Sequence, residues 1–103
     1  MDVFAALANP TRRRMLDLLT HGERSSGDFA AAFAGLTQPA ISRHLRVLRT
    51  VGLVKVRAEA QRRMYTLRTE PLSEVDAWLL RYRRFRSNHG NPAESSFAAT
   101  GEI

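Results

Sequence analysis

Residues 37–54 constrain the fold more than any other part of the chain. Thr37 is of a type that caps helix N-termini, and Pro39 falls in the first turn, where a missing backbone N–H costs nothing. Three apolar residues follow at the spacing of one buried helix face, namely Ile41, Leu45 and Leu48. Gly52 suits the left-handed conformation that ends helices, and after it the apolar period changes to two. The stretch predicts an amphipathic helix, Gln38–Thr50, followed by a β-strand.

The residues before this stretch predict three more helices. The first covers residues 2–8 and the second residues 10–20, while the third is capped by Ser25 or Ser26 and ends at Gly35. The first helix carries Val3, Phe4 and Leu7 on one side. The expected core residues of the other two helices are Met15, Leu18, Leu19, Phe29, Ala32 and Phe33. Two helices joined by a tight turn that contains glycine form a helix-turn-helix.

The second half of the chain predicts a hairpin and a long helix. Alternating apolar residues indicate antiparallel strands over residues 53–58 and 63–68, joined by residues 59–62. A last helix then runs from Pro71 to about Arg86. It carries a wide apolar stripe of Val75, Trp78, Leu79, Tyr82 and Phe85. Such a stripe is too aromatic for a peripheral helix on a small core, so we expect a partner subunit to cover it.

The expected fold is mainly α with a small β-hairpin, in the order α-α-α-α-β-β-α. A chain of 103 residues suits one domain with one core, and we assign it to residues 1–86. Residues 87–103 are small, polar and without periodicity, which is typical of a flexible tail.

The charge of the chain is concentrated around the helix Gln38–Thr50. The net charge is +6, and fifteen of the 16 basic residues are arginine, whose planar fork binds phosphate and guanine with two hydrogen bonds. Residues 29–58 contain no acidic residue, but they hold Arg43, Arg46, Arg49, Lys55 and Arg57. A local basic excess on a helix that fits the DNA major groove favours a nucleic-acid partner.

Helix geometry separates the two faces of this helix. At about 100° per residue, the side opposite Ile41 carries Pro39, Ser42, Arg43, Arg46 and Thr50. Gln38 lies at the exposed N-terminal end, the end that meets bases in helix-turn-helix docking. Glutamine pairs with adenine, arginine with guanine, and serine with either. His44 lies about 60° from the core direction, so we expect it to form a hydrogen bond within the domain.

Two other groups of arginines have a role that the sequence leaves open. Arg62 and Arg63 fall where a hairpin tip would reach the DNA backbone, although a solvated turn would hold the same residues. Residues 12–14 are three arginines at a helix start, where they oppose the macrodipole. They indicate either an anionic partner or a solvated face.

Several function classes find no support in the sequence. Without cysteine there is no disulfide or thiolate metal site, and the three scattered histidines make no metal site, so we expect no metal or other cofactor. No nucleophile–base pair, carboxylate pair or phosphate-binding loop indicates an enzyme. Neither a signal peptide nor a membrane span is recognisable, so we expect a cytoplasmic protein with no membrane partner.

Three segments resemble the ArsR/SmtB family of bacterial winged helix-turn-helix repressors. They are ALANPTRRRMLDLL, GERSSGDFAAAFAGLTQPAISRHLRVLRTVGLVKV and RRMYTL. The resemblance implies a homodimer built from the first and last helices, bound to a palindromic operator in double-stranded DNA. It implies DNA contact by Gln38, Ser42 and Arg43, and backbone contact by the wing near Gln61, Arg62 and Arg63.

The chain departs from the family pattern at two places. Family metal sensors carry cysteine pairs near the third helix or Asp and His ligands on the last helix, whereas these segments are DFAAAF and VDAWLLRYRRF here. The wing also has Ala60 where glycine is common. We therefore expect no metal-sensing site, and the inducer is unknown.

The sequence as a whole predicts a sequence-specific, homodimeric transcriptional repressor. The helix Gln38–Thr50 would enter the major groove, and the wing around Arg62 would contact the backbone. The predicted DNA-contacting residues are Thr37, Gln38, Pro39, Ser42, Arg43, Arg46, Gln61, Arg62 and Arg63. The predicted dimer interface consists of Val3, Phe4, Leu7, Val75, Trp78, Leu79, Tyr82 and Phe85. The alternatives are a winged-helix module that binds an acidic protein, and a metal-responsive repressor with an unrecognised site.

Overall fold

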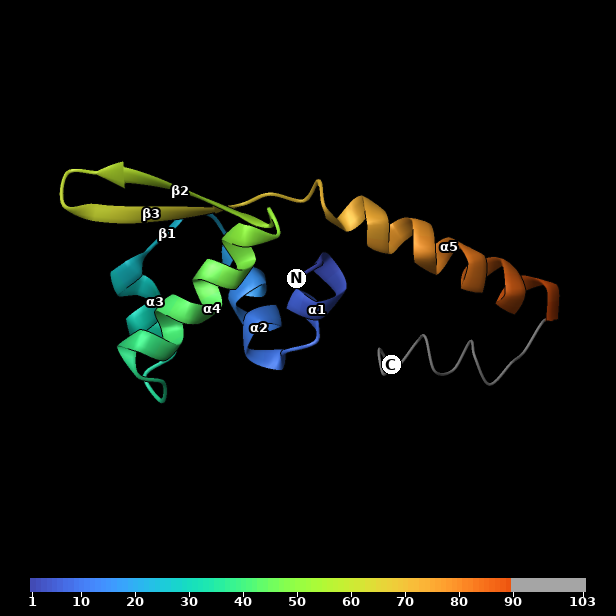
Figure 1. Cartoon of the computed structure of the whole chain (residues 1–103), viewed down its shortest axis with the longest axis horizontal. Helices are drawn as coiled ribbons and strands as arrows, with labels where there is room; N and C mark the ends of the chain where they lie inside the picture. The colour runs from blue at the N-terminus through green and yellow to red at the C-terminus, as the bar shows by residue number, and fades with distance from the viewer. Residues whose placement is uncertain (90–103) are drawn as a thin grey trace. The chain divides into compact units, whose positions relative to one another are not determined.

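The computed structural model describes residues 1–89 and confirms a mainly helical fold with a small antiparallel sheet (Figure 1). Its elements are α1 (Val3–Leu7), α2 (Pro10–Leu19), β1 (Arg24–Ser25), α3 (Ser26–Ala32), α4 (Gln38–Thr50), β2 (Val54–Glu59), β3 (Arg62–Leu67) and α5 (Leu72–His89). The chain divides after Ser73 into two compact units, so that α1 to α4 and the sheet lie in the first and most of α5 in the second.

Side-chain caps begin the helices at the predicted places. Asn9 Oδ1 accepts hydrogen bonds from the backbone N–H groups of the second and third residues after it, at 2.9 and 3.1 Å. Ser25, and not Ser26, caps α3 in a reciprocal capping box: Asp28 N–H donates to Ser25 Oγ at 3.1 Å, and Ser25 N–H donates to the Asp28 carboxylate at 2.8 Å. This hydrogen bond from the Ser25 backbone lowers the pKa of Asp28. Thr37 Oγ1 caps α4 by accepting from Ala40 N–H at 3.3 Å.

The core of the first unit lies where α2, α3 and α4 meet β3. Its buried apolar side chains are Val3, Ala6, Met15, Leu16, Leu19, Phe29, Ile41, Leu45, Leu48, Leu53, Val54, Met64 and Tyr65. The predicted buried face of α4 is confirmed. The Phe29 ring is fully buried and meets the Tyr65 ring edge-on at 5.6 Å between centroids.

Three core predictions for α2 and α3 need correction, namely Leu18, Ala32 and Phe33. On α2 the buried residue is Leu16 rather than Leu18, which is half-buried. On α3 Ala32 is exposed and Phe33 is half-buried. On α1 the second buried residue is Ala6, whereas Phe4 and Leu7 are half-buried. Apolar residues outnumber the positions that one helix face can bury, and the neighbouring elements select which of them face inward.

The sheet contains a third strand that the sequence analysis missed. Its order is β1-β3-β2, with Arg24 opposite Tyr65 and Glu59 opposite Arg62. The hairpin turn has two residues rather than the predicted four. Ala60, the first of them, has a φ of 56°, which lies in the left-handed region that glycine adopts more easily.

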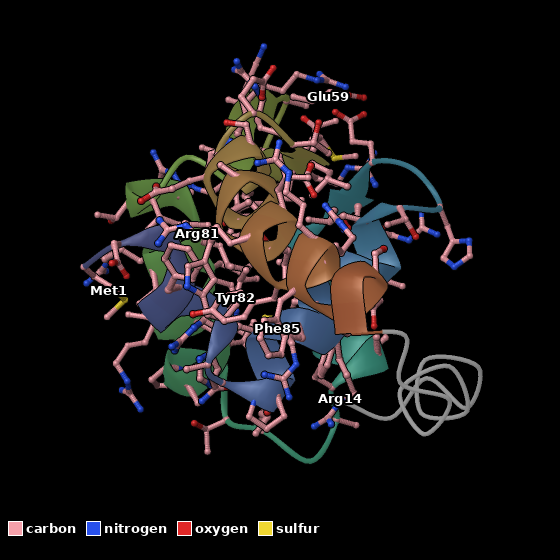
Figure 2. All side chains as sticks on the ribbon, turned by 90° about the vertical axis from the view of Figure 1, so that its right-hand side faces the viewer. Met1, Arg14, Glu59, Arg81, Tyr82 and Phe85 are labelled. Atoms are coloured by element: carbon pink, nitrogen blue, oxygen red, sulfur yellow. The ribbon has the colours of Figure 1, made fainter. Side chains whose placement is uncertain are left out.

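The helix α5 begins one residue after Pro71 and continues to His89, three residues beyond the predicted end. Tyr82 and Phe85 extend from neighbouring positions on its surface (Figure 2), with 50% and 56% of their area exposed. The rings of Trp78 and Tyr82 lie 5.0 Å apart. Residues 90–103 of the predicted tail lie outside the described part of the chain.

Candidate nucleic-acid interface

One side of α4, the wing strand β3 and the start of α3 line a common hollow. Its volume is about 280 Å³. The lining residues are Ser26, Gln38, Ser42, Leu45, Arg46, Arg49, Arg63 and Tyr65. Four residues predicted to contact DNA from two separate segments therefore meet at one place.

Arg49 and Ser26 belong to this hollow, although the sequence analysis did not include them among the DNA-contacting residues. Arg49 lies about 80° from Ile41 around the helix, between Gln38 and Ser42. Arg49 was therefore identifiable from the sequence, because it lies only about 20° from Ser42 around the helix. Ser26 reaches the hollow only because α3 packs against α4, and no local pattern reports that contact.

The arginines of α4 and Arg63 of the wing form no ion pair within residues 1–89. Among residues 1–89, the ion pairs join Arg57 to Glu23 and Glu59, Arg62 to Glu59, and Arg68 to Glu70. None involves Arg43, Arg46, Arg49 or Arg63, whose side chains belong to exposed residues. Their positive charges are therefore available to an external anion.

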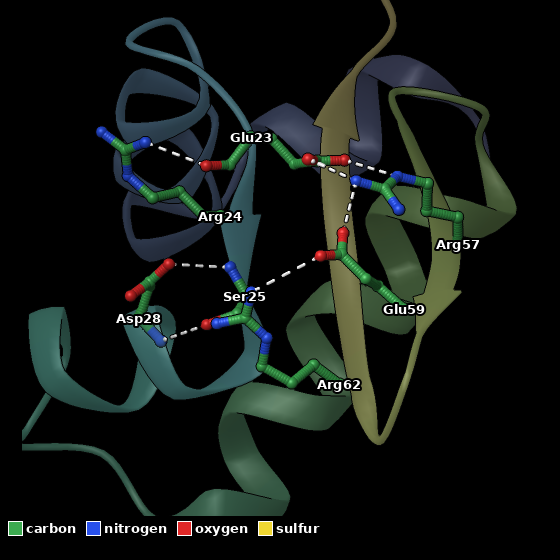
Figure 3. A network of polar contacts seen from close by, with 7 residues as sticks. All are labelled: Glu23, Arg24, Ser25, Asp28, Arg57, Glu59 and Arg62. Atoms are coloured by element: carbon green, nitrogen blue, oxygen red, sulfur yellow. Dashed lines mark hydrogen bonds and ion pairs between the residues drawn. The ribbon is translucent and has the colours of Figure 1, made fainter.

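The wing carries a different electrostatic arrangement, shown in Figure 3. The Arg57 guanidinium donates to both Glu23 carboxylate oxygens, at 2.9 and 2.8 Å, and lies 2.8 Å from the Glu59 carboxylate. These hydrogen bonds to Glu23 and then Glu59 raise the pKa of Arg57. Arg62 lies 3.9 Å from Glu59 and keeps 61% of its side chain exposed. The charge of Arg57 is thus used within the chain, and that of Arg62 is only loosely paired.

The remaining predicted contact residues are not among those that line the hollow. Pro39 and Arg43 are exposed on α4, and Gln61 is exposed in the turn of the wing. Thr37 is exposed but already uses its hydroxyl as the helix cap. One acceptor site of its hydroxyl is therefore occupied, and the O–H remains able to donate to DNA.

The arginine run at residues 12–14 has a structural role that neither interpretation anticipated. Arg12 donates from Nε to the Ala6 carbonyl at 2.8 Å and from Nη2 to the Ala5 carbonyl at 3.2 Å, and Arg13 donates to the Leu7 carbonyl at 2.6 Å. Two of the three arginines thus satisfy the C-terminal carbonyls of α1, where the helix dipole favours positive charge.

His44 forms a contact inside the domain, as its angular position predicts. Its Nδ1 lies 3.3 Å from Arg12 Nη1. Burial, followed by the charges of Arg12 and Arg43, lowers the pKa of His44. The imidazole is therefore neutral at pH 7.

The residues predicted for the dimer interface differ in exposure. Val3 is buried within its own unit, with 4% of its area exposed. Phe4, Leu7, Val75 and Leu79 are half-buried. Trp78, Tyr82 and Phe85 are exposed, and so is Leu80, which the predicted stripe did not include.

Residues 1–89 offer neither a metal-binding cluster nor a membrane-spanning helix. They contain no group of three or more His, Cys, Asp or Glu side chains placed to hold a metal ion. None of their helices has the length and apolar character needed to span a bilayer.

Comparison with known proteins identifies the family. A family described as a helix-turn-helix domain matches residues 7–57. The transcriptional repressor SdpR of Bacillus subtilis is 36% identical over 81 residues, which cover 79% of this chain and 89% of SdpR. The transcriptional activator HlyU of Vibrio cholerae is 44% identical over 62 residues, which cover 60% of this chain and 56% of HlyU.

A solved structure shows the same fold over nearly the whole chain. The ArsR-like transcriptional regulator from Rhodococcus sp. RHA1 is 26% identical, and it superposes with a TM-score of 0.73 over 95% of this chain and 88% of its own. With its basic helix, its wing and these relatives, the chain belongs to the ArsR family of winged helix-turn-helix transcriptional regulators and is a DNA-binding regulator.

Proposed function

We propose that this protein is a homodimeric repressor that inserts α4 into the major groove of a palindromic operator and rests its wing on the DNA backbone. The observation that carries the proposal is the hollow between α4 and β3. It gathers Gln38, Ser42, Arg46 and Arg63 from two segments, and its arginines have no ion pair within residues 1–89.

The geometry supports separate tasks for the two segments. A major groove about 12 Å wide accepts one α-helix. The exposed N-terminal half of α4 offers Gln38, Ser42 and Arg43 to base edges, with Arg46 one turn further along. The wing offers Gln61, Arg62 and Arg63, which suit the phosphate backbone because arginine forms two hydrogen bonds to phosphate. Thr37 and Pro39 pack the helix start against the groove.

The proposed dimer uses α5 together with α1. The aromatic side chains of α5 are about half exposed, and a contiguous apolar surface of this kind is typical of a subunit interface. A two-fold dimer would present its two α4 helices about one turn of DNA apart, near 34 Å. We therefore expect an operator with two inverted half-sites at that spacing.

Repression is the proposed outcome because SdpR, which the chain nearly spans, is named a repressor. HlyU is named an activator, so relatives of this chain include regulators of either sign. The protein would work in the cytoplasm, where bacterial DNA is found. We propose a regulator and not an enzyme, since the relatives are named as regulators.

Selection of bound duplexes from a random DNA pool tests the proposal. The expected product is an inverted repeat, and a reporter behind the selected operator should be less active when the protein is present. Salt-sensitive binding without any enriched sequence would contradict the proposal and favour a protein-binding module. Tight stoichiometric zinc or nickel binding that releases the DNA would instead indicate a metal-responsive repressor.

Arg43 provides a residue-level test on the selected operator. Arg43→Ala should cost about 1–3 kcal/mol of binding free energy and relax the preference at one base pair, because a guanine loses its two-bond partner. Equal weakening on every sequence would make Arg43 a phosphate contact instead.

A further inference from the structure

One side chain of α2 contacts both α1 and α4. The Arg12 guanidinium donates to the carbonyls of Ala5 and Ala6 at the end of α1, and its third nitrogen, Nη1, lies 3.3 Å from His44 Nδ1 on α4. The Arg12 backbone N–H is held in turn by the Asn9 cap, at 3.1 Å. The backbone of Arg12 is thus held by the Asn9 cap, and its side chain has three partners on two other helices.

The chemistry of this contact fixes the state of His44. An arginine side chain has only donors, so Nδ1 of His44 must accept and the ring proton must be on Nε2. An imidazolium would point an N–H at the guanidinium and lose the hydrogen bond. Arg12 of α2 and Arg43 of α4 are the charged groups that act on His44.

The contact between Arg12 and His44 restricts the orientation of α4 against α2, which apolar packing alone restricts only weakly. The helices α2 and α4 are in contact, and each buries apolar side chains such as Met15, Ile41 and Leu45; apolar burial is not directional. Hydrogen bonds weaken steeply when the donor or acceptor turns away. The position of α4 along and around its own axis is therefore defined more sharply where Arg12 meets His44.

We propose that Arg12 and His44 form a bracket that sets the position of α4 relative to α1, and through it the separation of the two DNA-reading helices in the dimer. The inference rests on the proposed function, because α1 is one of the two helices assigned to the dimer interface. Arg12 is a positioning residue. Its loss would relax the spacing of half-sites that the dimer accepts, while a single half-site would bind as before.

Arg13 supplies a matched control. It neighbours Arg12, donates to the Leu7 carbonyl of α1 at 2.6 Å, and forms no hydrogen bond or ion pair with α4 within residues 1–89. Replacing either arginine by lysine keeps the charge but removes the planar fork, so that one ammonium cannot serve both helices. Arg12→Lys should therefore lose the hydrogen bond to His44 on α4, whereas Arg13→Lys has no such hydrogen bond to lose.

The test measures binding of the full chain to duplexes that carry two selected half-sites at the selected spacing, or with one or two base pairs added or removed. For the wild type and Arg13→Lys we expect the same ratio of affinities between correct and altered spacing. For Arg12→Lys that ratio should fall by about fivefold or more, the lower end of coupling between sites. An equal change in both variants, or no change in either, would overturn the bracket.

Substitutions at His44 test the other half of the bracket. His44→Asn keeps an acceptor oxygen near the position of Nδ1 and should retain the spacing preference, whereas His44→Phe should lose it as Arg12→Lys does. If both substitutions weaken binding equally at every spacing and on a single half-site, His44 touches DNA and the bracket is wrong.

A second measurement separates this inference from the proposed function. If the wild type selects no DNA sequence, the proposed function fails, and the bracket is judged by unfolding in denaturant. Stability losses of Arg12→Lys and His44→Phe should then be smaller in the double variant than their sum, because the two residues share one contact. Additive losses would overturn the bracket whether or not the protein binds DNA.

Discussion

Replacing Arg63 by alanine should flatten the salt dependence of operator binding by about one unit of slope. Arg63 faces the hollow beside α4 and has no carboxylate partner in residues 1–89, so its charge is free to release one counterion from a phosphate. One phosphate contact contributes a slope of about −0.9 in log K against log salt. Between about 50 and 200 mM salt, the wild-type advantage over Arg63→Ala should therefore shrink by about 3.5-fold.

The assay is a titration of labelled operator by anisotropy at several salt concentrations. Arg68→Ala is the control, because it removes the same charge from just beyond the other end of β3. Arg68 is five residues away, about 16 Å along an extended chain, and pairs with Glu70 at 3.2 Å. For Arg68→Ala, the plot of log K against log salt should run parallel to that of the wild type. Equal flattening by both substitutions, or none for Arg63→Ala, would refute the argument that unpaired charge at the hollow marks the phosphate contact.

Three further predictions concern stability and assembly. Ala60→Gly should raise stability by up to about 1 kcal/mol in thermal unfolding, because relief of left-handed strain exceeds the added entropy of the unfolded chain, and a loss would contradict this. His44 has a pKa below its ordinary 6.5 in the folded chain, so the unfolded chain binds more protons just below that pH. Stability should fall as the pH drops from 6.5 towards the lowered pKa, and His44→Asn should lose this part of the dependence in melts across pH. Tyr82→Glu should shift sedimentation towards the monomer, whereas Arg84→Glu, on the opposite face of α5, should not. If both variants remain dimers, α5 is not part of the interface.

The helices were largely predictable because their signals are local. The Asn9 and Thr37 caps and the Gly52 stop each act within one turn, and α4 has the predicted bounds. Its buried face followed from spacing alone, since Ile41 and Leu45 lie one turn apart.

Other elements depended on contacts that no local pattern reports. The strand β1 has only two residues and exists because β3 pairs with it. On α2, four apolar residues compete for one face, and the neighbouring elements select Leu16 over Leu18. The predicted long turn of the wing was wrong because Ala60 adopts a conformation that sequence statistics assign to glycine.

The sequence by itself determined the helices, the basic face of α4 and the family, because periodicity, capping and charge count depend on neighbours within a few residues. Only the tertiary structure decided which arginines stay unpaired. Arg57 is neutralised by Glu23, which lies 34 residues away in the chain, and Arg12 is used by α1 and α4. Coulomb interactions and hydrogen bonds depend on distance in space and not on separation along the chain.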